Sequence, residues 1–172
     1  MGLRRVTILR GVKRALLLIL PVALALAASS CGGGGGGGQL SKGDYEAKIG
    51  AIVGPLQAPG GTLQSIVGMS AADRTGAVAA LKDGESKLHA AASELESLKP
   101  PDDAVAPTQA LAKGVGEIAD QVTVVRKDAE GGNFARLIQF KISLSSDPAV
   151  TEIRDAAVEL INLGYNITGQ GP

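Results

Sequence analysis

Apolar residues recur at helical spacing through most of the chain after residue 40. Leu111, Val115, Ile118, Val122 and Val125 are separated alternately by four and three residues. This spacing places side chains on one face of a helix and is typical of helices that pack together. No segment alternates apolar and polar residues as a strand does. The pattern therefore predicts an all-α fold, an antiparallel bundle of four or five helices.

Capping residues predict where the first helix begins. Ser41 and Asp44 resemble a capping box, in which the side chain of the first residue binds a free N–H group of the helix. Gly54 and Pro55 predict a kink or an end, because proline lacks the N–H group that a helix interior uses. Pro59 and the two glycines after it close the segment.

The next segments follow the same logic. Residues 62–69 predict one or two further helical turns. Ser70 is predicted as the N-cap of a long helix, with Asp73 at the end of the helix dipole that favours a negative charge. We expect this helix to run to about Lys99, where Pro100 and its neighbour stop it.

Turn residues also predict the last two helices. Gly131 and the glycine after it end the third helix, and Asn133 is predicted to cap a fourth. Asp147 followed by Pro148 is a typical start of a fifth helix, since aspartate caps N-termini and proline fits the first helical position. Gly164 is placed to cap the end of that helix.

The first 28 residues have the layout of a secretory signal peptide. Residues 1–14 are basic, and residues 15–28 are an apolar run of about 14 residues. A membrane-spanning helix needs about 20 residues, and Pro21 interrupts this run, so a permanent transmembrane helix is the weaker alternative. Arg4 and Arg5 leave twin-arginine export open beside general secretion, which we favour because no aromatic residue follows the pair.

A lone cysteine follows the apolar run after two serines. The residues LAASSC end at Cys31 and resemble the lipobox of bacterial lipoproteins. The resemblance implies cleavage between Ser30 and Cys31 and attachment of diacylglycerol to the Cys31 thiol. Two acyl chains hold a protein stably in a membrane, whereas one gives only marginal binding.

These features predict three parts of the chain. Residues 1–30 are the expected signal peptide, residues 31–40 the lipidated cysteine with a flexible glycine tether, and residues 41–172 the helical domain. Seven consecutive glycines span roughly 15 Å as a random coil. We therefore expect export and anchoring to the outer face of the cytoplasmic membrane. In a host with two membranes, the outer membrane is the alternative destination.

Charge and composition exclude some classes of partner. Twelve basic and seventeen acidic residues follow Ser30, so the mature part has a net charge of minus five. A chain of this charge gains nothing from the counterion release that favours binding to nucleic acid, and we expect no nucleic-acid partner. With four aromatic residues and no tryptophan, the chain also offers few platforms on which sugars or bases stack.

Candidate catalytic and metal-binding residues are few. His89 is the only histidine, and the only cysteine is the one expected to carry lipid, so no cysteine and histidine pair or multi-histidine metal site is expected. Asp83 with Glu85, and Asp102 with Asp103, are the closest carboxylate groups, and neither has calcium-loop spacing. We interpret them as solvated helix residues. The sequence predicts no enzyme, no catalytic residue, no cofactor and no metal.

Three segments carry a further resemblance. DYEAKIGAI at residues 44–52, SLKPP at residues 97–101 and GGNFARL at residues 131–137 together resemble small uncharacterised helical lipoproteins of actinobacteria. Many of those proteins have one cysteine in the first helix, near the position of Val53 here, and another beyond the position of Gly164. This chain has neither cysteine, so it has no such disulfide. The resemblance implies no particular activity.

Two functions remain open at this point. The first is a non-enzymatic envelope protein that has a structural role or interacts with another, unidentified envelope protein, and is held to the lipid bilayer through Cys31. The alternative is a carrier or accessory binding module for a small apolar ligand or a lipid. Helices rich in alanine and glycine, as here, leave room for such a groove.

Overall fold

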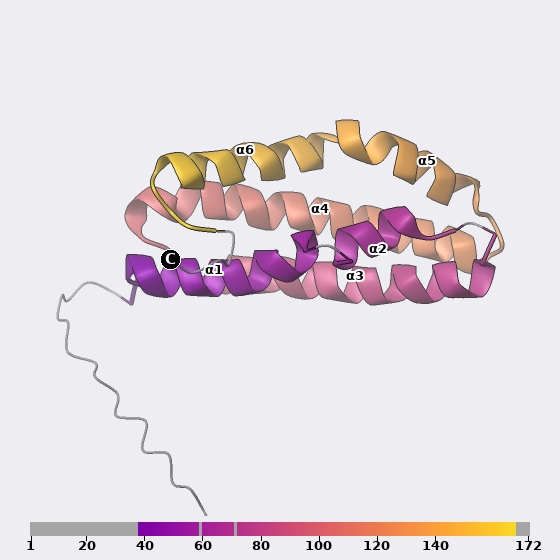
Figure 1. Cartoon of the computed structure of the whole chain (residues 1–172), viewed down its shortest axis with the longest axis horizontal. Coiled ribbons are helices and arrows are strands. Elements are labelled where there is room, and N and C mark those ends of the chain that lie inside the picture. Colours follow the sequence, from indigo (N-terminus) through magenta and orange to yellow (C-terminus); the bar gives the residue numbers. More distant parts are fainter. Residues whose placement is uncertain (1–37, 59, 71, 168–172) are drawn as a thin grey trace, which may run out of the picture. The chain divides into compact units, whose positions relative to one another are not determined.

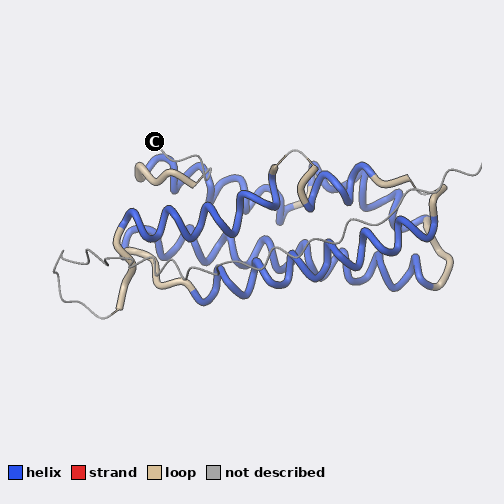
Figure 2. Tube along the Cα trace, turned by 60° about the horizontal axis from the view of Figure 1, so that its bottom comes forward, coloured by secondary structure: helices blue, strands red, loops and turns tan. Residues whose placement is uncertain are grey.

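The computed structural model describes residues 38–58, 60–70 and 72–167. These residues form six α-helices and two short 3-10 helices, with no strand among them (Figures 1 and 2). The prediction of an all-α fold is therefore confirmed for this part of the chain. The predicted signal peptide and Cys31 lie outside the described residues. The elements in chain order are α1 (Lys42–Gln57), α2 (Thr62–Gly68), α3 (Arg74–Ser97), η1 (Asp102–Ala104), α4 (Val105–Glu130), α5 (Ala135–Ser143), η2 (Leu144–Ser146) and α6 (Pro148–Asn162).

The two longest described helices, α3 and α4, run antiparallel and pack against each other more extensively than any other pair (Figure 1). Helices α1 and α2 follow one another along α3 and make a first outer row. Elements α5, η2 and α6 follow one another along α4 and make a second outer row. The five helices expected from the sequence correspond to α1, α3, α4, α5 and α6, and the turns expected at residues 62–69 form α2.

Two predicted helix starts are confirmed by their hydrogen bonds. The hydroxyl oxygen of Ser41 accepts a hydrogen bond from the N–H group of Asp44 at 3.2 Å and donates one to the Asp44 carboxylate. The carboxylate of Asp147 accepts a bond from the N–H group of Ala149 at 2.9 Å, and Pro148 occupies the first position of α6. Both caps satisfy N–H groups that have no partner within their helix.

Gly164 caps the C-terminus of α6 as predicted. Its φ angle of 82° lies in the left-handed region, which glycine adopts without steric cost. The N–H groups of Gly164 and Tyr165 then bind the carbonyl oxygens of Ile161 and Leu160, each at 2.9 Å. This is a Schellman motif, and Tyr165 and Leu160, the two positions at which such motifs commonly make an apolar contact, are both buried.

Other helix boundaries differ from the predictions. The prediction of Ser70 as the N-cap of α3 was wrong: Asp73 is the cap, and its carboxylate accepts a bond from the N–H group of Gly76 at 3.0 Å. Ser70 instead accepts a bond from a loop N–H group two residues on. Helix α1 continues through Pro55 to Gln57, so it does not end at Gly54 or Pro55, and it closes before the two glycines that were predicted to close the segment.

The start of α5 also differs by one residue. Phe134 is the residue at the N-cap position, and Asn133 precedes it. The side-chain oxygen of Asn133 still accepts a hydrogen bond from the N–H group of Ala135 at 3.1 Å. The predicted capping interaction of Asn133 is therefore present, although α5 begins one residue later than expected.

Small residues let α4 approach its neighbours closely. A methyl group added to Gly114 would lie 2.7 Å from Cγ1 of Ile153 and 3.0 Å from the carbonyl oxygen of Ala149, both on α6. On α3, a methyl group added to Gly84 would lie 2.6 Å from Cδ1 of Ile66 on α2. Both outer rows thus depend on a glycine of the central pair. None of the described helices is long and apolar enough to cross a membrane.

We expect Gly114→Ala to lower the free energy of unfolding by about 1–3 kcal/mol, because the backbone of α6 has to shift to admit the methyl group. The matched control is Gly116→Ala in the same helix, where the nearest atom is Cβ of Ala92 at 3.8 Å. That control should be neutral or stabilise by up to about 1 kcal/mol, because alanine favours a helix interior over glycine. Urea unfolding followed by circular dichroism measures both. Equal effects of the two substitutions would contradict the close packing of α4 on α6.

Candidate functional site

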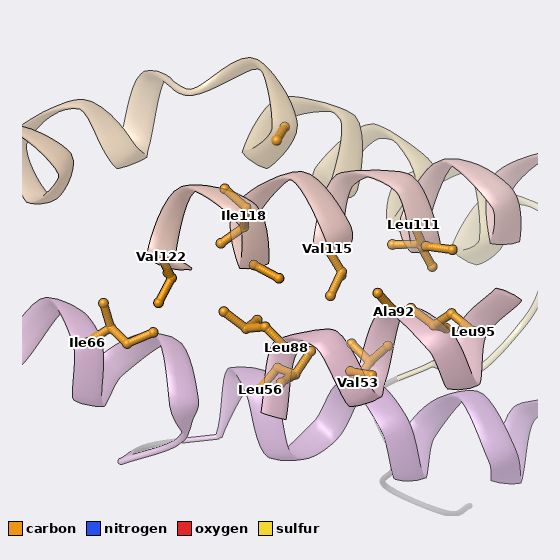
Figure 3. Packing of buried hydrophobic residues seen from close by; sticks show 14 of the residues in the cluster. Val53, Leu56, Ile66, Leu88, Ala92, Leu95, Leu111, Val115, Ile118 and Val122 are labelled. Atoms are coloured by element: carbon orange, nitrogen blue, oxygen red, sulfur yellow. The ribbon is translucent and has the colours of Figure 1, made fainter. Parts of the chain in front are cut away.

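An apolar pocket of about 290 Å³ lies between the central helices and the two outer rows. Its floor consists of buried side chains of α3 and α4 that point toward one another across the gap, and Val53 and Leu56 of α1 form one wall (Figure 3). The lining residues are Val53, Leu56, Gln57, Leu63, Val67, Leu88, Leu111, Val115, Ile118, Leu144, Ser145, Val150 and Ile153.

The pocket lies where both outer rows are interrupted. One side is lined by the end of α1 and by α2, and the other side by η2 and the start of α6. The two breaks lie at a similar level along the central helices (Figure 1). A continuous helix in either row would place side chains over this part of α4. The pocket therefore lies where each outer row passes from one helix to the next, between α1 and α2 on one side and at Asp147 on the other.

The chemistry of the lining is almost entirely hydrocarbon. Of the thirteen lining residues only Gln57 and Ser145 have polar side chains, and both are exposed residues. No lining residue has a charged side chain, a thiol or an imidazole. Such a pocket binds apolar groups by removing them from water, and it offers no group that would orient an anion or activate a bond.

The histidine and the first carboxylate pair lie elsewhere, on an outer face of α3 and α4. Glu85 binds the Arg126 guanidinium and accepts a hydrogen bond from the Thr123 hydroxyl, and the hydrogen bond from Arg126 lowers the pKa of Glu85. His89 is about half exposed, and its Nε2 lies 3.3 Å from the Thr123 hydroxyl oxygen. Asp83 instead pairs with a lysine one turn away at 2.7 Å. This network connects two helices and does not reach the pocket.

The second carboxylate pair, Asp102 and Asp103, binds residues from the beginning and the end of the helical domain. The Tyr165 hydroxyl donates to the carboxylate of Asp103 at 2.6 Å, and the side-chain amide of Gln39 donates to Asp102. The rings of Tyr165 and Tyr45 meet edge to face with centroids 5.1 Å apart. The Tyr45 hydroxyl shares a hydrogen bond of 2.7 Å with buried Thr108.

This cluster ties the first helix to the C-terminal segment without a disulfide. The N–H group of Asn166 also donates to the carboxylate of Glu46 at 3.0 Å, and the ammonium group of Lys42 lies 5.0 Å from the centre of the Tyr165 ring. The sequence interpretation of Asp102 and Asp103 as solvated helix-start residues missed this role. Their partners are 62 or more residues away in the chain, so no local pattern identified them.

The sequence-based candidates are thus not brought together. His89 and Glu85 lie in one network, Asp102 and Asp103 in another, and Ser30 and Cys31 fall outside the described residues. Within the described ranges, no group of three His, Cys, Asp or Glu residues is placed to hold a metal ion. The pocket itself was expected only as a groove between small helical residues, with no position assigned.

Comparisons of this chain with family models, with curated proteins and with solved structures gave no match.

The tyrosine cluster makes the stability of the fold depend on pH above about 10. Burial, and then the hydrogen bond to Asp103, raise the pKa of Tyr165 to about 12. Burial also raises the pKa of Tyr45. Because a tyrosine pKa is about 10 in an unfolded chain, the raised values contribute stability that is fully present below pH of about 10. This stability is lost as the pH rises through the folded-state values.

We expect Asp103→Asn to lower the pKa of Tyr165, because the carbonyl oxygen of asparagine still accepts the hydrogen bond but has no negative charge. The chain has only two tyrosines, so ultraviolet titration of phenolate measures the change directly. Asp102→Asn is the matched control, because the partner of Asp102 is Gln39. If Asp103→Asn leaves the titration curve unchanged, the Asp103 carboxylate does not raise the pKa of Tyr165.

Proposed function

We propose that this chain is an exported, lipid-anchored protein whose helical unit binds a small apolar ligand in the pocket between its outer rows. The pocket is the observation that carries this proposal. Of the two functions left open by the sequence, the geometry favours the binding module, since a purely structural helical unit has no need of an apolar space of about 290 Å³.

The volume of the pocket limits the size of the ligand. A cavity of about 150 Å³ lined by aliphatic and aromatic side chains binds benzene, which has six carbon atoms. The present pocket has about twice that volume. It therefore accommodates roughly a dozen carbon atoms, the size of a medium-length acyl chain or of the terminal half of a longer one.

The distribution of polar groups indicates how such a ligand would lie. The floor is formed by Leu88, Leu111 and Ile118, each about 1 % exposed, whereas Gln57 and Ser145 are exposed residues at the opening. A hydrocarbon chain would thus enter end first and leave a polar head group at the surface. Amide and hydroxyl groups at the opening bind an uncharged or a charged head with little discrimination. We infer selection by the size of the apolar part.

A non-catalytic role fits the same chemistry. None of the residues that line the pocket can act as a general acid or base. The lining contains one hydroxyl group, that of Ser145, and no histidine that could activate it. His89, the residue that an acid or base mechanism would need, lies in the network with Glu85 and Thr123. We therefore propose binding and release of the ligand without chemical change.

Anchoring follows from the lipobox and the tether. Lipid on Cys31 would hold the helical domain at a typical distance of roughly 15 Å from a membrane surface through seven glycines. A binding module at that distance can exchange acyl chains with the bilayer or receive them from other envelope proteins. Membrane attachment and an apolar pocket are thus mutually consistent features.

We expect Leu63→Trp to reduce the affinity of the protein for aminoanthracene, an uncharged fluorescent probe, by tenfold or more. Leu63 is half-buried in the pocket wall, and the larger side chain fills the space that the probe needs. Loss of about 1.4 kcal/mol of binding free energy corresponds to tenfold. Fluorescence titration measures the affinity, and displacement by dodecanol tests the ligand class.

Leu98→Trp is the matched control, because Leu98 is also half-buried but lines a separate groove between the end of α3 and the start of α4. It should leave probe affinity unchanged. Two results together would refute the proposed binding function. Native mass spectrometry would detect no bound apolar molecule, and the affinity for the probe would be the same in wild type, Leu63→Trp and Leu98→Trp.

We expect Cys31→Ser to abolish lipid attachment and processing. The wild-type protein expressed in a bacterial host should lose residues 1–30 and gain the mass of a diacylglyceryl group, because the thiol is the alkylated nucleophile. It should also partition into detergent. Intact mass and phase partition measure these changes. If the wild type and the variant behave alike, residues 1–30 are an ordinary signal or a retained anchor.

A further inference from the structure

Two basic side chains of the second outer row lie on either side of the pocket opening. Lys141 of α5 lies one helical turn before Ser145, and Arg154 of α6 lies one turn after Val150. Ser145 and Val150 both line the pocket, whereas the two basic residues do not. Residues four positions apart share one side of a helix, so both cations lie beside the opening and outside the apolar lining.

A hydrogen bond fixes the position of the first cation. The ammonium group of Lys141 donates to the carbonyl oxygen of Met69 at 2.8 Å. Met69 directly follows α2, whose residue Val67 lines the pocket, so this bond crosses from one outer row to the other beside the opening. A carbonyl group has no net charge, and an ammonium group has three N–H donors. Lys141 therefore keeps its positive charge and two donors for a further partner.

The second cation has no charged neighbour on its own helix. Arg154 is exposed and forms no ion pair with a described residue, and the same holds for Lys141. Residues three and four positions away are the neighbours of a side chain on a helix surface. For Arg154 these are Val150, Thr151, Ala157 and Val158.

The acidic residues of α6 lie on its other flank. Glu152 is two residues before Arg154, and two residues turn a helix by about 200°. The Glu152 carboxylate accepts a hydrogen bond from the ammonium group of Lys113 on α4 at 2.8 Å. Asp155 and Glu159 are three and seven residues after Glu152, so they share its side of the helix. None of the three carboxylates is directed toward the opening.

The remaining carboxylate near the opening is that of Asp147, at the break of the second row. It accepts a hydrogen bond from the N–H group of Ala149 and caps α6, where the positive end of the helix dipole opposes its charge. The neighbouring segments 47–72 and 131–146 contain no acidic residue. Two cations and one capped carboxylate therefore surround the opening, and the local charge is positive.

We propose that the ligand of the pocket is a fatty acid, whose hydrocarbon chain fills the apolar lining and whose carboxylate lies between Lys141 and Arg154. The inference rests on the proposed function and adds a choice of head group to selection by size. A chain that enters end first leaves its head at the level of these side chains. Ammonium and guanidinium groups donate charge-assisted hydrogen bonds to carboxylates, and an uncharged head gains no such bond.

The net negative charge of the mature chain does not oppose this binding. Charges farther away than about 8 Å are largely screened at physiological ionic strength, so the nearest groups decide. Because exposed ion pairs are weak, we expect each cation to increase the affinity for a carboxylate by about threefold. The two contributions should multiply to about tenfold, since the residues do not contact each other.

The test measures displacement of aminoanthracene from full-length, lipidated protein in phosphatidylcholine vesicles at about pH 8, where carboxylic acids are ionised. Lys141→Met and Arg154→Met should each raise the half-displacing concentration of dodecanoate about threefold, and the double variant about tenfold. Dodecanol, with the same chain and no charge, should displace the probe equally from all proteins. Protein-free vesicles correct for partition of the ligands into the bilayer.

Two further variants separate charge from structure. Arg136→Met is the matched control, because Arg136 is the other basic residue of α5 and binds Asp128 at 2.6 Å. It should leave dodecanoate binding unchanged. Asp147→Asn keeps a good N-cap and removes the negative charge, so it should strengthen dodecanoate binding about twofold. Salt at about 1 M should remove most of these differences.

Four results would overturn the proposal. In the first, the double variant binds dodecanoate as wild type does while the probe still binds, and the pocket then remains a binding site without a preference for anions. In the second, dodecyltrimethylammonium is weakened together with dodecanoate, so the substitutions change the shape of the pocket. In the third, phosphatidylglycerol in the vesicles displaces the probe and dodecanoate does not, which assigns the anion to a bilayer lipid. In the fourth, no protein binds the probe, and the proposed function fails as well.

Discussion

The close packing of α4 against the helices around it is the constraint on which the described structure depends. Helix α4 is continuous over 26 residues, and both α3 and the second outer row pack on it. It has no side chain at Gly114, where α6 approaches. The hydrophobic contacts of the outer rows therefore form at short range, and side chains such as Leu111 and Ile118 become almost fully buried.

The pocket is a consequence of this arrangement and not of a special set of residues. The central pair is long and unbroken, whereas each outer row consists of two helices with a break between them. Near these breaks the helices of the two rows leave a space above the side chains of α3 and α4, although those side chains are themselves almost fully buried. Both breaks have local causes, namely the glycine pair Gly60 and Gly61 in the first row and the Asp147 cap in the second.

Much of the local structure was predictable from sequence because its causes are local. Ser41, Asp147 and Gly164 act within four residues of their own positions, and each behaves as expected. Ser70 and Asp73 were both suitable caps, and a choice between neighbouring caps depends on tertiary packing that the pattern of residues does not contain. The pocket and the contacts of Asp103 with Tyr165 depend on residues far apart in the chain, so spacing rules did not find them.

The candidate carboxylates of the helical domain make their polar interactions within the domain. Each carboxylate that spacing made a candidate has a partner inside the unit: Asp83 and Glu85 bind basic side chains, and Asp102 and Asp103 bind Gln39 and Tyr165. A carboxylate engaged in this way stabilises the fold, and its use by a ligand would first require loss of that contact. The pocket requires no such exchange, because none of its lining residues has a charged side chain.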